Sequence, residues 1–467
     1  MGQRFSNTPN DEDNGNLPSS FTKYFKNYKP ETKIISEEIT HSIELRLKNG
    51  DLQGANSVIS NVLKVIDNAK INIAVTGESG SGKSSLINAL RKVKHAGESS
   101  ATVGVTETTM EIKPYEHPKV KNLILWDLPG IGTPNFEPNN YLEKVEFKKY
   151  DFFIIVSSPR FTKHELDLAK AIIMMKKNYY FVRTKVDIDL KNEETCHRHT
   201  FDREKTLNQI RNYYLDSFRK SKINEPQVFL ISNQDLSNYD FPVLMDTLIK
   251  DLPAEKRHNF LLSIPNITEA AIQKKYNSAK QFIWLSAMKD GLFATFPRMG
   301  ILNDLDMNKL KKRLNFYRDL FGVDDESLIS IAMDAQMPIR QLKKKLKSPY
   351  LLEFNKEETL RELLLKGMAI FTSANGGLLA TGLYFTKTYY LEFHFLNTVA
   401  EDAKVVLKEA FRRMPGPVSR RGYPARGVGR RRVQGFVLVI LGGLVFLGFF
   451  WVFFLEVNLG KEISYDM

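Results

Sequence analysis

The chain has 467 residues, of which 42% are hydrophobic and 26% are charged, and its formal net charge is +13. This length exceeds one ordinary hydrophobic core and predicts two or three folded domains. The single cysteine, Cys196, excludes an internal disulfide framework. Without a second cysteine, we interpret Cys196 as part of a polar surface loop and not as a structural zinc or redox site.

The positive charge is unevenly distributed. Residues 412–467 hold nine Lys/Arg and three Asp/Glu, a net charge of +6, which leaves +7 for all preceding residues. Such a basic tail indicates that the C-terminal segment lies near an anionic surface of a partner. We expect no nucleic-acid partner. The first twenty residues are polar and lack the apolar segment of a secretory signal peptide.

Residues 1–32 begin with a lipidation signal. Met1-Gly2-Gln3-Arg4-Phe5-Ser6 fits M-G-x-x-x-S, which directs N-myristoylation of Gly2 unless the match arises by chance. Between residues 33 and 70, two runs of apolar side chains recur at helical spacing, separated by Asn49-Gly50. We therefore predict a helical hairpin ahead of the next domain.

A glycine-rich stretch lies between a predicted strand at 71–76 and a predicted helix. It matches G-x-x-x-x-G-K-S, whose glycines let backbone N–H groups turn towards phosphate oxygens at the positive end of the helix. In this pattern Lys83 contacts the β- and γ-phosphates and the Ser84 hydroxyl ligates Mg²⁺. The context favours a phosphate site over an ordinary glycine–serine turn. The predicted nucleotide contacts are Gly77, Glu78, Ser79, Gly80, Ser81, Gly82, Lys83, Ser84 and Ser85.

From residue 71 to 253, apolar runs alternate with helical segments, which indicates a doubly wound α/β domain. Nearly all of the apolar runs are continuous, as expected for parallel strands that are covered on both faces. We predict strands at 71–76, 109–113, 123–127, 152–157, 179–184 and 228–232.

A D-x-x-G element follows the strand at 123–127. Asp127 would support Mg²⁺, usually through water, and the N–H of Gly130 would contact the γ-phosphate. That contact is lost on hydrolysis, so the segment is a natural switch. One threonine of the preceding segment should also ligand Mg²⁺ in the GTP state, and spacing leaves Thr102 and Thr109 as candidates.

The third element, Thr184-Lys185-Val186-Asp187, selects the base. The Asp187 carboxylate can accept hydrogen bonds from guanine N1–H and the 2-amino group, whereas adenine would leave it unpaired. The Lys185 stem can stack along the base. Ser232 and Asn233, after the strand at 228–232, match the loop that contacts guanine O6. Four elements in order on successive strands indicate GTP and GDP as ligands.

Ile131 follows the switch glycine, where Ras-like GTPases carry a glutamine that orients the attacking water. An isoleucine cannot do this. Either another residue or a second molecule must complete the site. Dimerisation across the nucleotide face could supply the missing group, and hydrolysis would then depend on protein concentration.

Residues 254–411 are predicted to be mainly helical, with apolar spacing of three to four at 305–320 and 357–371. Ile264-Pro265-Asn266 and Phe296-Pro297 mark breaks. This bundle could pack against the hairpin at 33–70. The predicted fold class is therefore α/β, a Ras-like P-loop GTPase domain flanked by a helical domain that is built from N- and C-terminal segments.

The remaining chain changes character twice. Residues 412–434 contain eight arginines, three prolines and four glycines, which predicts a flexible basic linker. Residues 435–455 then run for 21 positions without a charge, long enough for a transmembrane helix, and a short tail, 456–467, follows. The arginines would place the preceding side in the cytoplasm, as in a tail anchor. A buried core helix and a coding extension that is not normally expressed are the alternatives.

The phosphate loop, the Trp-Asp-Leu-Pro-Gly-Ile-Gly stretch and Thr-Lys-Val-Asp resemble those of the interferon-inducible immunity-related GTPases. Stretches outside these motifs match the same family, at 150–155, 239–244 and 256–260. The resemblance covers about residues 1–412. Since many families share a phosphate loop, the stretches outside it make the resemblance specific.

The resemblance implies a dynamin-like protein that binds GTP and GDP, assembles with itself and with related GTPases, and hydrolyses GTP cooperatively. Members act in innate defence on vacuoles that hold intracellular pathogens. Lys83 is typical of the Gly-Lys-Ser subgroup. In relatives a switch glutamate acts in catalysis across the dimer, and Glu107 occupies the matching position. Val103 stands where relatives have a switch threonine, which leaves the Mg²⁺ ligand open.

We therefore expect a GTP-hydrolysing, self-assembling protein of the cytoplasm and of intracellular membranes, with Lys83 and Glu107 as its catalytic residues. The competing hypothesis is a GTP-gated membrane scaffold with negligible turnover, because no glutamine follows Gly130. Turnover measured against protein concentration separates the two.

Overall fold

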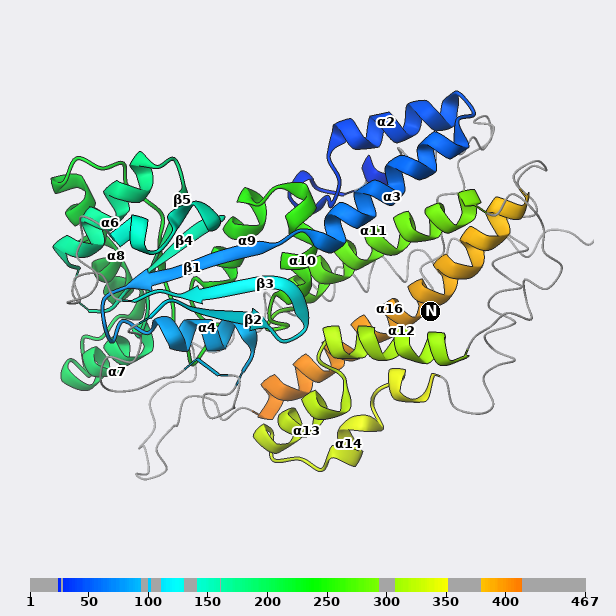
Figure 1. Ribbon diagram of the computed structural model, residues 1–467. Coiled ribbons are helices and arrows are strands. Elements are labelled where there is room, and N and C mark those ends of the chain that lie inside the picture. Colours follow the sequence, from blue (N-terminus) through cyan, green and yellow to red (C-terminus); the bar gives the residue numbers. More distant parts are fainter. Residues whose placement is uncertain are drawn as a thin grey trace, which may run out of the picture. The chain divides into compact units, whose positions relative to one another are not determined.

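The computed structural model describes residues 24–26, 28–93, 100–101, 111–129, 141–159, 161–293, 307–351 and 379–413. The chain divides into two units, Met1–Met414 and Pro415–Met467, and every described residue belongs to the first. Figure 1 shows a twisted sheet with its helices and a separate set of longer helices within this unit.

A sheet of six strands forms the centre of the α/β part, in the order β2-β3-β1-β4-β5-β6. All neighbouring pairs are parallel except β2 with β3. The four parallel strand pairs place the carboxyl ends of β1, β3, β4, β5 and β6 at one edge of the sheet. The strands are β1 (Ile71–Gly77), β2 (Lys113–His117), β3 (Val120–Asp127), β4 (Phe152–Ser157), β5 (Asn178–Arg183) and β6 (Val228–Leu230).

The strand expected at 109–113 is misplaced in the sequence interpretation. The observed strand β2 begins at Lys113 and pairs antiparallel with β3, with Pro114 opposite Trp126. Because β2 is an edge strand, it tolerates a proline and charged side chains that a central strand would exclude. The apolar pattern that located the central strands is therefore absent here.

Helices cover both faces of the sheet (Figure 1). One apolar cluster joins β1 and β3 to α4, α9 and α10 (Ala254–Ser263), through residues such as Leu86 and Leu248. The other joins β4 and β5 to α6, α7 and α8, through residues such as Leu168 and Phe218. The helices of this part are α4 (Lys83–Arg91), α5 (Tyr141–Lys144), η2 (Phe147–Lys149), α6 (Lys163–Met174), α7 (Val186–Cys196), α8 (Arg203–Lys220) and α9 (Phe241–Asp251).

The remaining helices share a third apolar cluster, in which Ile43 and Ile59 lie together with Ile283 and Phe395. Segments from both ends of the described chain thus form one core, as the predicted hairpin and bundle require. The elements are η1 (Pro30–Thr32), α2 (Glu37–Lys48), α3 (Leu52–Asn68), α11 (Glu269–Phe293), α12 (Met307–Leu320), α13 (Asp325–Asp334), α14 (Ile339–Lys343), η3 (Ser348–Tyr350) and α16 (Leu379–Arg413).

Local signals explain where these helices begin and end. The side chains of Ser36 and Asp51 accept hydrogen bonds from the first turns of α2 and α3, and so cap both helices of the hairpin. The break expected at Ile264-Pro265-Asn266 separates α10 from α11. Residues 357–371 and Phe296-Pro297 lie outside the described residues.

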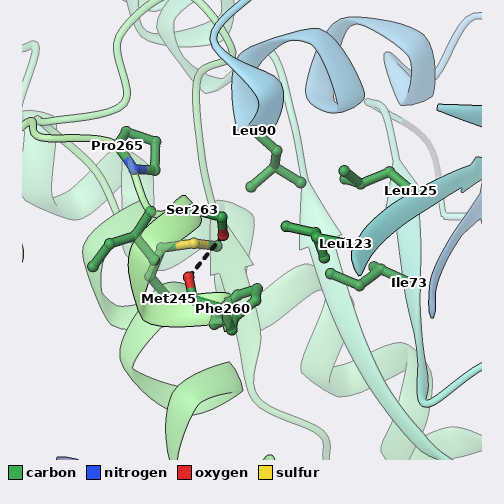
Figure 2. A pocket seen from close by; sticks show the side chains of 9 residues that line it. Ile73, Leu90, Leu123, Leu125, Met245, Phe260, Ser263 and Pro265 are labelled. Carbon is green, nitrogen blue, oxygen red and sulfur yellow. Dashed lines mark hydrogen bonds between the residues drawn. The ribbon is translucent and has the colours of Figure 1, made fainter. Parts of the chain in front are cut away.

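A small apolar space lies between the sheet and the helices α4, α9 and α10. Figure 2 shows its lining, in which the Ser263 hydroxyl donates to the carbonyl of Phe260 at 2.7 Å. Its volume of about 10 Å³ leaves room for one water molecule at most, so it is a packing gap and cannot hold a nucleotide. The lining residues are Ile73, Leu90, Leu123, Leu125, Met245, Phe260, Ser263, Ile264 and Pro265.

Several sequence predictions concern parts of the chain beyond the described residues: Gly2, residues 414–434 of the basic linker and the apolar run at 435–455. The first two residues of the predicted linker, Arg412 and Arg413, are described and end helix α16, so the linker was predicted to begin two residues too early. Among the helices that the structure does describe, none has the length and apolar character needed to cross a bilayer. We expected Cys196 in a surface loop. The structure instead places it as the exposed last residue of α7.

Candidate nucleotide-binding site

The predicted phosphate loop joins β1, which ends at Gly77, to α4, which begins at Lys83. Gly77 has φ +138°, and a Cβ there would collide with the carbonyl oxygen of Val156 on β4. Gly82 has φ +98° and is the N-cap of α4. Only glycine meets both requirements without strain, so the motif glycines shape the loop.

Lys83 and Ser84 point from the first turn of α4 to different parts of the loop region. The Lys83 side chain is buried, and its ammonium donates to the carbonyls of Gly77 at 3.3 Å and Glu78 at 2.9 Å. The Ser84 hydroxyl donates to Oδ2 of Asp127, at the end of β3, at 2.6 Å. The structure therefore brings together the two predicted Mg²⁺ ligands that come from distant motifs.

The donor set at this point fits magnesium. A hydroxyl and a carboxylate are hard oxygen donors of the kind that Mg²⁺ prefers, and both side chains are largely buried. Within the described residues, no group of three or more His, Cys, Asp and Glu side chains forms an alternative metal site. Ser84 and Asp127 are thus the residues that would hold the ion.

The predicted base-binding segments lie at the same edge of the sheet. Thr184 follows β5, Lys185 has a left-handed backbone with φ +61°, and Asp187 lies half-buried in the first turn of α7. Ser232 follows β6, and its hydroxyl accepts the backbone N–H groups of Gln234 at 3.1 Å and Asp235 at 3.3 Å. These bonds form the turn that presents Asn233.

Three consecutive carbonyls of the phosphate loop accept hydrogen bonds from these segments. Lys185 Nζ donates to Gly80 at 2.8 Å and Thr184 Oγ1 to Ser81 at 2.6 Å. The third donor is Asn233 Nδ2, which lies 3.1 Å from the carbonyl of Gly82. The phosphate loop and the base-binding segments are therefore one hydrogen-bonded unit, in which the loop is held before any ligand arrives.

Comparisons with known proteins agree with this geometry. A family model described as "Interferon-inducible GTPase (IIGP)" matches residues 36–410. The chain belongs to the interferon-inducible GTPase family. Interferon-inducible GTPase 1 of Mus musculus is 50% identical over 409 residues, which cover 88% of this chain and 99% of that protein.

Two further relatives extend the comparison. Interferon-gamma-inducible GTPase 10 of Mus musculus is 46% identical, over 88% of this chain and 97% of its own length. Interferon-inducible GTPase 5 of Bos taurus is 36% identical, over 80% of this chain and 83% of its own length. The resemblance found in the motifs thus extends through the helical segments that precede and follow the α/β part in the sequence.

Two buried ionisable residues of this interferon-inducible GTPase were missed by the sequence interpretation. Arg183, at the end of β5, pairs with Asp189 and donates to the carbonyl of Thr184, which ties the start of α7 to the base-binding segment. Burial raises the pKa of the Asp189 carboxyl, and the Arg183 guanidinium opposes that shift. A charged residue inside an apolar strand is the signal that could have revealed Arg183.

Glu165, in the first turn of α6, is the second. Its Oε2 accepts the Ser157 hydroxyl at 3.0 Å and the backbone N–H of Thr162 at 3.2 Å. Burial raises its pKa to about 8, so the carboxyl is mostly protonated at neutral pH. Glu165 therefore fixes the turn after β4 without placing a full negative charge beside the phosphate loop.

The switch residues of this GTPase lie beyond what the structure describes. They are the candidate Mg²⁺ ligands Thr102 and Thr109, the candidate catalytic Glu107, and Gly130 with its successor Ile131. Their roles therefore stay predictions from the sequence and from the family resemblance. Asp127, Leu128 and Pro129, just before Gly130, are described and reach the edge of the site.

Proposed function

We propose that this interferon-inducible GTPase binds GTP across the edge of the sheet and hydrolyses it to GDP and phosphate. The observation that carries the proposal is the bonding of Thr184, Lys185 and Asn233 to successive carbonyls of the phosphate loop. A nucleotide whose base lies at Asp187 then has its phosphates at the N-terminus of α4. Nucleotide binding and phosphate release are the assays that test it.

Each group of the site has a separate task in this proposal. The Lys83 ammonium exchanges its loop carbonyls for phosphate oxygens and holds them by charge-assisted bonds. Ser84 and Asp127 would hold Mg²⁺, which when bound would neutralise phosphate charge. The Asp187 carboxylate accepts the two guanine donors.

We further propose that a second copy completes the catalytic site. No glutamine follows Gly130, and Glu107 is the switch carboxylate that the family resemblance points to. A glutamate supplied across a dimer would orient the attacking water only while two copies are in contact. GTP would then promote assembly, and hydrolysis would end it.

The specific GTPase activity should therefore rise severalfold across a dilution series of the purified protein, because the fraction of paired sites rises. Phosphate release per mole of protein, measured at saturating GTP, checks this expectation. Glu107→Ala should remove the rise of specific activity with protein concentration, while nucleotide affinity stays unchanged. Activity near zero at every concentration would favour the GTP-gated scaffold instead.

The site of action that we propose is an intracellular membrane, such as that of a pathogen-containing vacuole, reached from the cytoplasm. The support is the myristoylation signal at Gly2, the arginines of residues 412–434 and the uncharged run at 435–455. The interferon-inducible GTPase family to which the chain belongs supports a role in immunity, and the role that we propose is defence against intracellular pathogens.

Gly2→Ala should leave the protein in the membrane fraction of cell lysates, because the uncharged run at 435–455 is long enough to anchor it alone. Fractionation after carbonate extraction provides the measurement. A variant that lacks residues 435–467 but keeps Gly2 is the matched control, and carbonate should release it from the membranes. If the Gly2→Ala variant is found in the soluble fraction, the C-terminal run does not anchor the protein.

A further inference from the structure

Tyr141, the first residue of α5, makes two hydrogen bonds that the functions assigned above do not use. Its side chain is fully buried. The phenolic oxygen lies 2.6 Å from Thr76 Oγ1 and 3.0 Å from the carbonyl oxygen of Pro129. Thr76 comes directly before Gly77, where the phosphate loop begins, and Pro129 comes directly before Gly130, the predicted γ-phosphate contact, so the tyrosine joins the residues that precede these two elements.

The direction of these bonds follows from their chemistry. A carbonyl oxygen can only accept, so Tyr141 donates its single proton to Pro129. The tyrosine oxygen must then accept the bond from the Thr76 hydroxyl. Burial raises the pKa of Tyr141, so the phenol keeps its proton at every physiological pH. The result is a directed chain from β1 through Tyr141 to the switch segment.

A backbone bond reinforces this chain. The N–H of Leu128 donates to the carbonyl of Val75 at 3.0 Å, so the residues after β3 continue alongside β1. A peptide unit is planar, and a bond that restrains the Pro129 carbonyl restrains the unit joining Pro129 to the next residue. Gly130, whose N–H is the predicted γ-phosphate contact, is that next residue.

We propose that Tyr141 is a positioning residue through which the protein discriminates GTP from GDP. Its hydroxyl holds the Pro129 carbonyl so that the switch peptide is presented to a γ-phosphate. GDP has no γ-phosphate and does not use that contact. This inference rests on the proposed GTP-binding function and adds to it a residue that touches neither nucleotide nor metal.

The chain offers a matched pair of variants. Tyr141→Phe removes only the hydroxyl and keeps the ring in the apolar cluster that surrounds it. Tyr150 belongs to the same cluster and is equally buried, but its hydroxyl has no hydrogen-bond partner within the described residues. Tyr150→Phe therefore controls for the loss of a buried phenol oxygen as such.

The experiment measures dissociation constants of the full chain for GDP and for a non-hydrolysable GTP analogue, with Mg²⁺ present. For Tyr141→Phe we expect the affinity for the GTP analogue to fall about three- to tenfold, as for one lost hydrogen bond, while GDP affinity changes less than about twofold. Tyr150→Phe should leave the ratio of the two affinities at the wild-type value.

Equal losses for both nucleotides, or no loss for either, would overturn the inference, because Tyr141 would then be only a packing residue. Unfolding temperatures of both variants show whether a general loss of stability has occurred, and the affinity ratio is insensitive to such a loss. Wild-type protein that binds neither nucleotide would instead refute the proposed function, so the two failures are distinguishable.

Discussion

Lys83→Ala is expected to lower GTP turnover by about a hundred- to a thousandfold, the usual cost of removing one preorganised charged donor from a reacting centre. Lys83 is buried inside the phosphate loop, and its ammonium is already directed at loop carbonyls that phosphate oxygens would replace. The measurement is phosphate release at saturating GTP and at a protein concentration where wild type is most active.

Two comparisons make the Lys83 result interpretable. Lys64→Ala removes the same charge from an exposed position on α3 and should leave turnover unchanged. Thermal unfolding of Lys83→Ala shows whether the unpaired carbonyls of Gly77 and Glu78 destabilise the loop. Wild-type turnover in a folded Lys83→Ala protein would contradict the phosphate role assigned to this side chain.

Asp187→Asn is expected to weaken GTP binding about a hundredfold and to improve the relative binding of xanthosine triphosphate. A carboxylate accepts both guanine donors, whereas an amide places its own N–H₂ opposite one of them. Xanthine carries a carbonyl in place of the 2-amino group, so it matches the amide. Competition binding with guanine, xanthine and adenine nucleotides measures the change.

Glu194→Gln is the matched control for Asp187→Asn, because it neutralises an exposed carboxylate on the same helix, α7. It should leave the order of nucleotide preference unchanged. If Asp187→Asn keeps the guanine preference of the wild type, the base does not lie at Asp187, and the assignment of the base-binding segment is wrong.

The positions of the central strands and of the phosphate loop could be predicted from the sequence because both depend on local patterns. Continuous apolar runs identify central strands, and a glycine with positive φ is required wherever the loop turns as it does at Gly82. The edge strand β2 carries Lys113 and Pro114 and gives no such pattern, so it was placed four residues too early.

The contacts that join the motifs could not be inferred from the sequence. Asn233 was predicted to contact guanine, but its amide group also holds the Gly82 carbonyl, 151 residues away. Tyr141 looks like an ordinary core residue until the fold brings Thr76, 65 residues away, within 2.6 Å of its oxygen. Such bonds depend on side-chain positions that only the packed sheet defines.

The shared core of α2, α3 and the later helices has a consequence for the order of folding. The hairpin is synthesised before its partners in α11 and α16, so its apolar face stays uncovered until the intervening α/β segment has emerged. That segment is continuous and has its own core, so it can fold first. In the folded chain, Asn259 lies near the end of the α/β segment and donates to the carbonyls of Ile66 and Ala69, which lie just before the start of that segment. Folding of the segment thus brings the two halves of the helical core together and lowers the entropic cost of joining them.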